Sequence, residues 1–302
     1  MSKAEAVEHP NLLALSCLFS QQLGLTTPAA PLTADQFGEM VETVMEEAGV
    51  KRPGQARTAD ARVVRMFLLM ARHSYQRMLN PAPEPDRGLV QKALSFRSKG
   101  PETKSNFAQS RCDEASACRR VAEIERRVPE GATVLFLGDD DGVSPLLAEK
   151  YQVTMIDLDH EIVQWIAEVA PDVRAERCHV LQTPDSFTGA FQAVVADPIR
   201  GMEAEWFLLA AQKCLAAGGH FFWADHPDWN FAFPALQFQA EKSMELLDCL
   251  ENWHCYPASI PVSEDETSGL GSEHQRFLEL GRLISLWSNL YIFRKRVDCR
   301  RS

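Results

Sequence analysis

The chain has 302 residues, room for about two domains, and 45% of them are hydrophobic and 24% charged. This composition is typical of a globular protein, and it excludes a disordered or collagen-like chain. The 42 acidic residues outnumber the 31 basic ones and give a formal charge of −11. That charge disfavours general binding to nucleic-acid phosphates and favours encounters with cations, polyamines included.

The eight cysteines form neither a Cys-x-x-Cys pair nor a His/Cys cluster with the spacing of a zinc site. The N-terminus lacks the basic and apolar segments of a secretory signal, and no apolar run approaches the roughly 20 residues that cross a bilayer. We therefore expect a reduced, cytoplasmic protein that uses no metal and no membrane.

Apolar residues recur at helical spacing through residues 1–80, which predicts a helical N-terminal domain that serves as a cap or an oligomerisation domain. Its helices are expected at 10–25, at 33–44 with a polar start, and at 59–79. Three prolines between 81 and 85 then break any helix, so residues 81–105 are predicted to be a linker or loop. The second domain is expected to span 106–302.

From residue 113 the sequence alternates helical segments with apolar strands, which predicts an α/β fold with a doubly wound, mostly parallel sheet covered on both faces. Ligands of such sheets bind at the carboxyl ends of the strands. The expected strands are 134–137, 153–156, 178–182, 191–196, 220–224 and 289–293. The expected helices are 113–128, 145–151, 161–170, 203–216, 240–250 and 277–287, with an acidic loop at 263–272.

Gly138, Asp139, Asp140 and Asp141 directly follow the first of these strands. The glycine lets the backbone turn tightly, and three successive carboxylates repel one another unless a cation or a ligand rich in donors lies between them. The loop lacks the G-x-G-x-x-G spacing of a dinucleotide site, and nothing in it neutralises a phosphate. Both observations favour a ligand without phosphates.

Asp157 and Asp159 follow the second strand, close to the roughly 20 residues after the glycine turn at which nucleotide-binding sheets place a ribose-binding acid. A nucleoside without phosphates fits both clusters. S-adenosylmethionine is such a nucleoside, and its amino group and sulfonium are positive, which suits aspartates.

Asp197 and Pro198 follow the strand 191–196, where the reacting group of such a substrate would lie. An aspartate there could position an attacking amine or accept its proton, although Asp-Pro also commonly starts a turn. Asp225 and His226, after the next strand, could line the pocket of a cationic acceptor, or the same loop could cap a later helix.

The segments Val134–Asp141, Val153–Asp159 and Val194–Pro198 resemble those of the branched-chain polyamine synthases, the bis(aminopropyl)spermidine synthases. The similarity extends over roughly residues 105–230 and includes the sequence before the sheet, around Phe107 and Arg120. The run of one glycine and three aspartates is fairly specific to that family, whereas the other two segments are common in S-adenosylmethionine-dependent folds.

The resemblance implies a methyltransferase-like Rossmann sheet behind a smaller N-terminal domain. It implies transfer of an aminopropyl group from decarboxylated S-adenosylmethionine to an amine of a polyamine such as spermidine, with no permanently bound cofactor and no metal. Asp141 and Asp197 would then be catalytic, and Pro198, Arg200, Asp225 and His226 would line the substrate site. The remaining acids and the glycine would bind the co-substrate: Gly138, Asp139, Asp140, Asp157 and Asp159.

Arg200 and Gly201 follow Asp197 where the family has a second proline, an acid and a threonine. A guanidinium there could bind a carboxylate, which leaves open an aminocarboxypropyl transferase of the nicotianamine type, or a methyltransferase, using undecarboxylated S-adenosylmethionine. A non-catalytic nucleoside-binding protein is the third interpretation, because a fold alone does not establish an activity. The expected partners are a small amine or amino acid and, in a homodimer, a second copy of the chain.

Overall fold

The structure of the protein is a computed structural model, in which the described residues are 30–47, 49, 59–104, 107, 109–198, 201, 203–228, 230, 232–257 and 285–297. The chain divides into two compact units. One unit joins Met1–Ala82 to Pro257–Trp287, and the other joins Pro83–Tyr256 to Ser288–Ser302. This division differs from the expected boundaries, because residues 257–287 group with the N-terminal segment.

In the first unit the helices α2 (Ala34–Glu47) and α3 (Ala59–Leu79) confirm two of the predicted helices. Thr33 begins α2 with a reciprocal capping box: its Oγ1 accepts from the Gln36 amide (3.2 Å) and its amide donates to Gln36 Oε1 (2.9 Å). Phe37 of α2 stacks on Tyr75 of α3 with ring centroids 3.9 Å apart. The helix predicted at 10–25 lies outside the described residues.

The second unit begins with helix α4 (Arg87–Arg97), so the prediction of irregular structure throughout 81–105 is wrong for these residues. The prolines do end the preceding helix. Asp86 then starts a new one, because its side chain accepts a hydrogen bond from the Leu89 amide (2.8 Å) and thereby satisfies one of the first amides of the helix.

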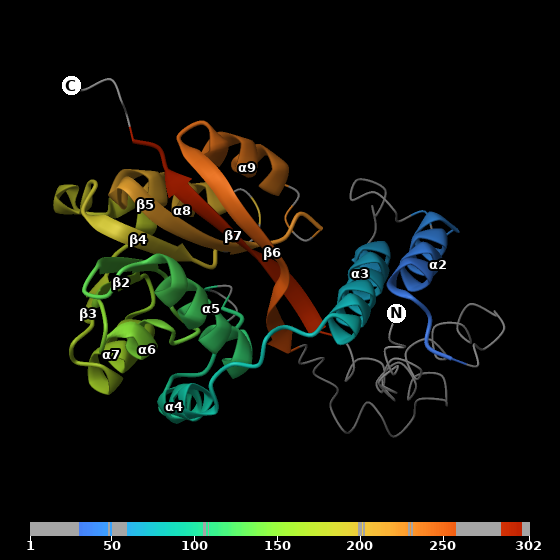
Figure 1. The fold of residues 1–302 in the computed structure, drawn as a ribbon, viewed down its shortest axis with the longest axis horizontal. Coiled ribbons are helices and arrows are strands. Elements are labelled where there is room, and N and C mark those ends of the chain that lie inside the picture. Colours follow the sequence, from blue (N-terminus) through green and yellow to red (C-terminus); the bar gives the residue numbers. More distant parts are fainter. Residues whose placement is uncertain are drawn as a thin grey trace, which may run out of the picture. The chain divides into compact units, whose positions relative to one another are not determined.

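A seven-stranded sheet with the order β3-β2-β1-β4-β5-β7-β6 forms the centre of this unit, and it confirms the predicted doubly wound α/β fold. The first five strands are parallel, and β7 runs antiparallel to β5, between β5 and β6 (Figure 1). The strands are β1 (Thr133–Leu137), β2 (Gln152–Asp157), β3 (Arg174–Arg177), β4 (Phe191–Ala196), β5 (Leu215–Asp225), β6 (Met244–Pro257) and β7 (Ser285–Lys295).

Because the chain winds in opposite directions from β1, right-handed crossovers place the helices on both faces of the sheet. The helices are α5 (Glu114–Arg127), α6 (Ser144–Leu147), α7 (His160–Val169), α8 (Ala204–Cys214) and α9 (Phe233–Glu241). None of the helices among the described residues is both long and apolar enough to cross a bilayer.

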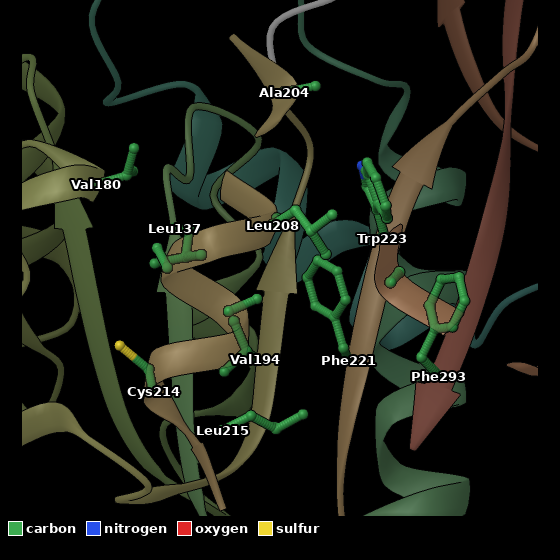
Figure 2. Close-up of a cluster of buried hydrophobic side chains, with 14 of the residues drawn as sticks. Leu137, Val180, Val194, Ala204, Leu208, Cys214, Leu215, Phe221, Trp223 and Phe293 are labelled. Carbon is green, nitrogen blue, oxygen red and sulfur yellow. The ribbon is translucent and has the colours of Figure 1, made fainter. Parts of the chain in front are cut away.

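The core on one face is built from alternate residues of four strands and from α8 and α9 (Figure 2). Leu208 and Cys214 of α8 lie against Leu137, Val194 and Phe221 in this view. The intervening strand residues, Phe136, Val195 and Phe222 among them, are also fully buried, so the opposite face is covered as well. This burial on both faces explains the near-continuous apolar runs of the strands.

Four predicted elements differ from the structure. The strand expected at 178–182 is a 3-10 turn (Val180–Gln182), and the real strand is the preceding polar segment β3, which lies at the exposed edge of the sheet. The helix expected at 240–250 is the end of α9 followed by β6. The helix expected at 145–151 is only the short α6, and of the one expected at 277–287 the described residues 285–287 belong to β7.

Gly142, in the loop after β1, provides a test of how tightly this loop packs on α7. Its φ is +65°, and a Cβ there would lie 2.6 Å from Cη2 of Trp165. Gly189 has a φ of +66° but nothing within 4 Å of the same position. We expect Gly189→Ala to cost about 1 kcal/mol for the backbone conformation alone. Gly142→Ala should cost about 3 kcal/mol, because it adds a clash with a packed ring.

Urea unfolding of the two variants measures this difference directly, since the matched φ values cancel the backbone contribution. Equal losses of stability in both variants would mean that the Trp165 ring moves aside and that the loop is less constrained than the structure indicates.

Candidate active site

Three acidic loops meet at the carboxyl edge of the sheet because their strands are neighbours in register. Leu137 at the end of β1 pairs with Ile156 of β2 on one side and with Ala196 of β4 on the other. The loops that follow therefore converge at the point where the strand order reverses. The predicted site residues Asp139–Asp141, Asp157 and Asp197 are brought together there.

Asp139 is buried and holds the loop in shape. Its two carboxylate oxygens accept hydrogen bonds from the amides of Val143 and Ser144, each at 2.8 Å, at the start of α6. Burial raises the pKa of Asp139 to about 7, against the opposing effect of these hydrogen bonds. The side chain has little capacity left for a ligand.

Asp141 is also buried, and both of its oxygens face protein groups. Oδ1 accepts from the amide of Cys112 (2.7 Å), and Oδ2 forms an ion pair with Nη1 of Arg120 (3.1 Å) without a hydrogen bond. The guanidinium of Arg97 donates to the Asp141 carbonyl (2.8 Å) and lies 3.8 Å from Oδ1. Asp141 is thus tied to two buried cations.

Asp140 differs from its two neighbours because it is only partly buried. Its Oδ2 accepts a hydrogen bond from the Ser110 amide (3.1 Å), and among the described residues no cation pairs with its carboxylate. Burial raises the pKa of Asp140 well above its usual range, and the negative charges of Asp141, Asp197 and Asp157 raise it further. A carboxyl group in this environment binds a proton more readily than a solvent-exposed aspartate does.

Asp197 shares a buried cation with Asp141. Nη2 of Arg120 lies 2.7 Å from Asp197 Oδ2, and the hydroxyl of Tyr256 donates to the same oxygen at 2.5 Å. Burial raises the pKa of Asp197; Arg120 opposes this effect and the charge of Asp141 adds to it. The side chain of Asp197 is 22% exposed, whereas that of Arg120 is only 3% exposed.

Arg120 also belongs to a closed cycle of hydrogen bonds, which we call the Arg120 ring. Its Nε donates to Nε2 of His254 (3.1 Å), whose Nδ1 lies 3.3 Å from Oγ of Ser288. The Ser288 hydroxyl lies 3.2 Å from that of Tyr256. The members of the ring are Arg120, His254, Ser288, Tyr256 and Asp197, and they come from α5, β6, β7 and the end of β4.

Asp157 and Asp159 lie at the end of β2 with different tasks. Asp157 accepts from the amides of Asp159 (2.8 Å) and Asp139 (3.3 Å), and burial raises its pKa. Asp159 is buried and caps α7. Burial would raise its pKa, but hydrogen bonds from Lys104 and Gln109, each 3.0 Å long, outweigh that effect and lower it. Asp157 retains free lone pairs, whereas the Asp159 carboxylate is occupied.

The other predicted residues that the structure describes lie at the same edge of the sheet. Gly138 turns the chain with a φ of +75°, and a Cβ there would lie 3.8 Å from Asp157 Oδ2. Pro198 is buried next to Asp197, and Arg200 lies outside the described residues. Asp225 accepts from the amide of His226 (2.7 Å) and from Nδ2 of Asn230 (2.8 Å), so it shapes the loop after β5.

Five residues of the site were not predicted from the sequence: Arg97, Arg120, His254, Tyr256 and Ser288. Arg120 carried a readable signal, because it falls within the apolar stripe of α5, beside Val121 and one turn before Ile124. His254 and Tyr256 follow directly after the segment predicted as a helix. As alternate residues of β6 they share a face, which the wrong helix prediction concealed.

Residues 88–212 match the sequence model of the branched-chain polyamine synthase A C-terminal domain. Two crystal structures from Thermus thermophilus, of the branched-chain polyamine synthase and of a mutein, are both complexes with N4-aminopropylspermidine and 5'-methylthioadenosine. Each is 16% identical to this chain, covers 98% of it and 96% of its own length, and superposes with a TM-score of 0.57 or 0.58.

A TehB-like S-adenosylmethionine-dependent methyltransferase from Corynebacterium glutamicum, 15% identical over 69% of this chain and 97% of its own, has a TM-score of 0.43. None of the curated proteins compared with the chain matches it. The resemblance to the branched-chain polyamine synthases is thus confirmed over residues 88–212, and the seven-stranded sheet confirms the predicted doubly wound fold for the second unit.

The central position of Arg120 can be tested through stability. We expect Arg120→Met to destabilise the protein by about 3–5 kcal/mol at pH 7, because it leaves buried carboxylates without their cation. The pKa of Asp197, which burial already raises, should rise further in this variant because Arg120 no longer opposes that effect. The stability deficit is therefore complete above that raised pKa, and it shrinks as the pH falls through it.

Chemical denaturation between pH 4 and 8 measures both effects. Arg119→Met is the matched control, since Arg119 is also largely buried on α5 but contacts Ser116 and the Trp253 carbonyl instead of Asp141 or Asp197. Its deficit should be smaller and nearly independent of pH. A pH-independent deficit in Arg120→Met would contradict the charge pairing.

Proposed function

We propose that the protein transfers an aminopropyl group from decarboxylated S-adenosylmethionine to an amine of a polyamine such as spermidine. The observation that carries the proposal is the Asp140 carboxylate. It stands at the switch point of the sheet among four other carboxylates, and among the described residues no cation pairs with it. A site of this kind attracts an amine and can take its proton.

The contacts of the nearby arginines favour a co-substrate without a carboxylate, such as decarboxylated S-adenosylmethionine. Arg97 and Arg120 are bonded to protein oxygens and nitrogens, as described above. Arg111 donates to the carbonyls of Asp140 (2.7 Å) and Pro101 (2.6 Å) and lies over the ring of Trp165. Each of these three guanidiniums already contacts protein atoms, so the carboxylate of intact S-adenosylmethionine would have to compete with those contacts. Asp157, with lone pairs remaining, is suited to accept hydrogen bonds from ribose hydroxyls.

The chemistry follows from the placement of two carboxylates. The nitrogen of the acceptor amine attacks the methylene carbon next to the sulfonium, the C–N bond forms as the C–S bond breaks, and methylthioadenosine leaves with the electron pair. Asp140 takes the proton of the amine, and Asp197 binds and orients the cation. In this assignment Asp141, predicted from the sequence to be catalytic, acts through Arg120, and Asp140, predicted to bind the co-substrate, is the catalytic base.

The ligands of the related enzyme fit this scheme. The Thermus thermophilus structures hold a branched polyamine together with methylthioadenosine, the two classes of product that the proposed reaction releases.

The six described cysteines are all free thiols, which supports the expected cytoplasmic location.

A thermal-shift and calorimetric titration with three nucleosides separates the proposed function from its alternatives. Methylthioadenosine and decarboxylated S-adenosylmethionine should stabilise the protein more than S-adenosylhomocysteine does. A preference for S-adenosylhomocysteine would favour methyl or aminocarboxypropyl transfer, and mass spectrometry of the products distinguishes these two. Binding without turnover of any polyamine would favour a non-catalytic nucleoside-binding protein.

The role of Asp140 leads to a kinetic prediction. Asp140→Asn should lower kcat by at least ~100-fold, the usual contribution of a general base, with the affinity for methylthioadenosine nearly unchanged. In the unmodified enzyme kcat/KM should rise with pH through the raised pKa of Asp140, since the base must be ionised. The variant should lose this pH dependence.

Steady-state assays at several pH values measure both quantities. Asp172→Asn, at an exposed position between α7 and β3, serves as the control for removal of one surface charge. If Asp140→Asn retained most of its kcat, Asp140 would not be the base.

A further inference from the structure

We infer that Tyr256 is a positioning residue for Asp197, which it holds as the last donor of the Arg120 ring. The inference deepens the proposed function and rests on it, because Asp197 matters as the group that binds and orients the acceptor. It goes beyond that function in assigning a role to β6 and β7, the last two strands of the sheet.

The direction of the hydrogen bonds in the ring follows from the donor and acceptor capacity of each group. A guanidinium has no acceptor, so Nε of Arg120 must donate to Nε2 of His254. His254 is then neutral and carries its proton on Nδ1. Burial lowers the pKa of His254 well below its usual range, and the charge of Arg120 lowers it further, in agreement with this tautomer.

The donor and the acceptor of each remaining hydrogen bond in the ring follow from this tautomer of His254. Nδ1 of His254 donates to Ser288, so the hydroxyl hydrogen of Ser288 is available to Tyr256, and the hydroxyl of Tyr256 donates to Asp197. Each hydrogen bond in the ring therefore has one donor hydrogen and one acceptor. Both paths that leave Arg120 thus end on the same atom, Oδ2 of Asp197.

This convergence distinguishes the two oxygens of Asp197. Oδ2 receives Nη2 of Arg120 at 2.7 Å and the hydroxyl of Tyr256 at 2.5 Å. Oδ1 takes no hydrogen bond from the part of the chain that the structure describes. Since the side chain is 22% exposed, the ring fixes the carboxylate through one oxygen and leaves the other for the ammonium group of a substrate.

Tyr256 is the member of the ring whose contribution can be removed with the least disturbance. Its side chain is buried, and Tyr256→Phe keeps the ring of carbon atoms while it removes the hydroxyl that stabilises the ionised carboxylate. The charged or titratable groups that face Asp197 and the ring come from three parts of the unit, and they stay in place in this variant: Arg119 and Arg120 on α5, Cys112, Asp140 and Asp141 in the loops, and His254 on β6.

Titration of Asp197 itself provides the test. In protein labelled with 13C at the aspartate carboxyls, the signal that Asp197→Asn abolishes identifies Asp197. In Tyr256→Phe its titration midpoint should move upward by about one pH unit, the order of magnitude of one hydrogen bond to a charged group. Tyr151→Phe is the matched control, because Tyr151 is also buried and donates one hydrogen bond (3.0 Å) to the Val128 carbonyl. Tyr151 directly precedes β2, so it lies at the edge of the sheet opposite to the acidic loops.

An unchanged midpoint in Tyr256→Phe, or an equal shift in Tyr151→Phe, overturns the inference. Ser288→Ala keeps the test available if Tyr256→Phe does not fold. It removes the donor to Tyr256 without touching Asp197, and it should move the midpoint in the same direction by a smaller amount.

Activity assays separate this inference from the proposed function. If the enzyme transfers aminopropyl groups, the KM for the polyamine should rise in Tyr256→Phe by a larger factor than kcat falls, because Asp197 binds the ammonium group and Asp140 takes the proton. An unchanged KM counts against the inference. If the unmodified protein transfers no aminopropyl group to any polyamine, the proposed function fails, and the titration of Asp197 still decides whether Tyr256 controls it.

Discussion

The guanidinium of Arg120 is the interaction on which the candidate site depends. Five carboxylates meet at one edge of the sheet, and two of them, Asp141 and Asp197, lie within 3.1 Å of this one cation. A buried ion is costly unless its charge and its hydrogen-bonding capacity are both satisfied. Arg120 meets this condition through three directed contacts, and in doing so it connects α5 to the loops after β1 and β4 and to β6.

The three consecutive aspartates after β1 illustrate how position divides one residue type among several tasks. Asp139 closes the turn into α6, Asp141 meets the buried cations, and Asp140, between them, remains partly exposed and keeps a raised pKa. Their carboxylates differ because of the donors that reach them, the amides of Val143, Cys112 and Ser110, and not because of anything in the run itself. A site that must both attract a cation and hold a proton needs carboxylates whose environments differ in this way.

The alternation of helices and apolar strands was sufficient to predict the sheet, since strands buried on both faces leave a clear hydrophobic record. It was also sufficient to predict that Asp139–Asp141, Asp157 and Asp197 converge, because parallel strands end at one edge. It failed at β6, whose first half does not alternate regularly between buried and exposed residues and so lacks the period-two pattern of a strand. The ring residues His254 and Tyr256 were lost with that strand, and no local pattern divides Asp140 from Asp141, since their partners are distant in the sequence.

The position of β6 and β7 also bears on how the site assembles. Arg120 and His254 are separated by 134 residues, and Tyr256 and Asp197 by 59, so the ring closes only after the last strands have docked beside β5. Contacts of such high sequence separation form late, because the entropy of closing long loops opposes them. A nascent chain that ends before β6 can build the acidic loops but not their neutral donors. A complete site at this edge of the sheet therefore reports that the last two strands have docked.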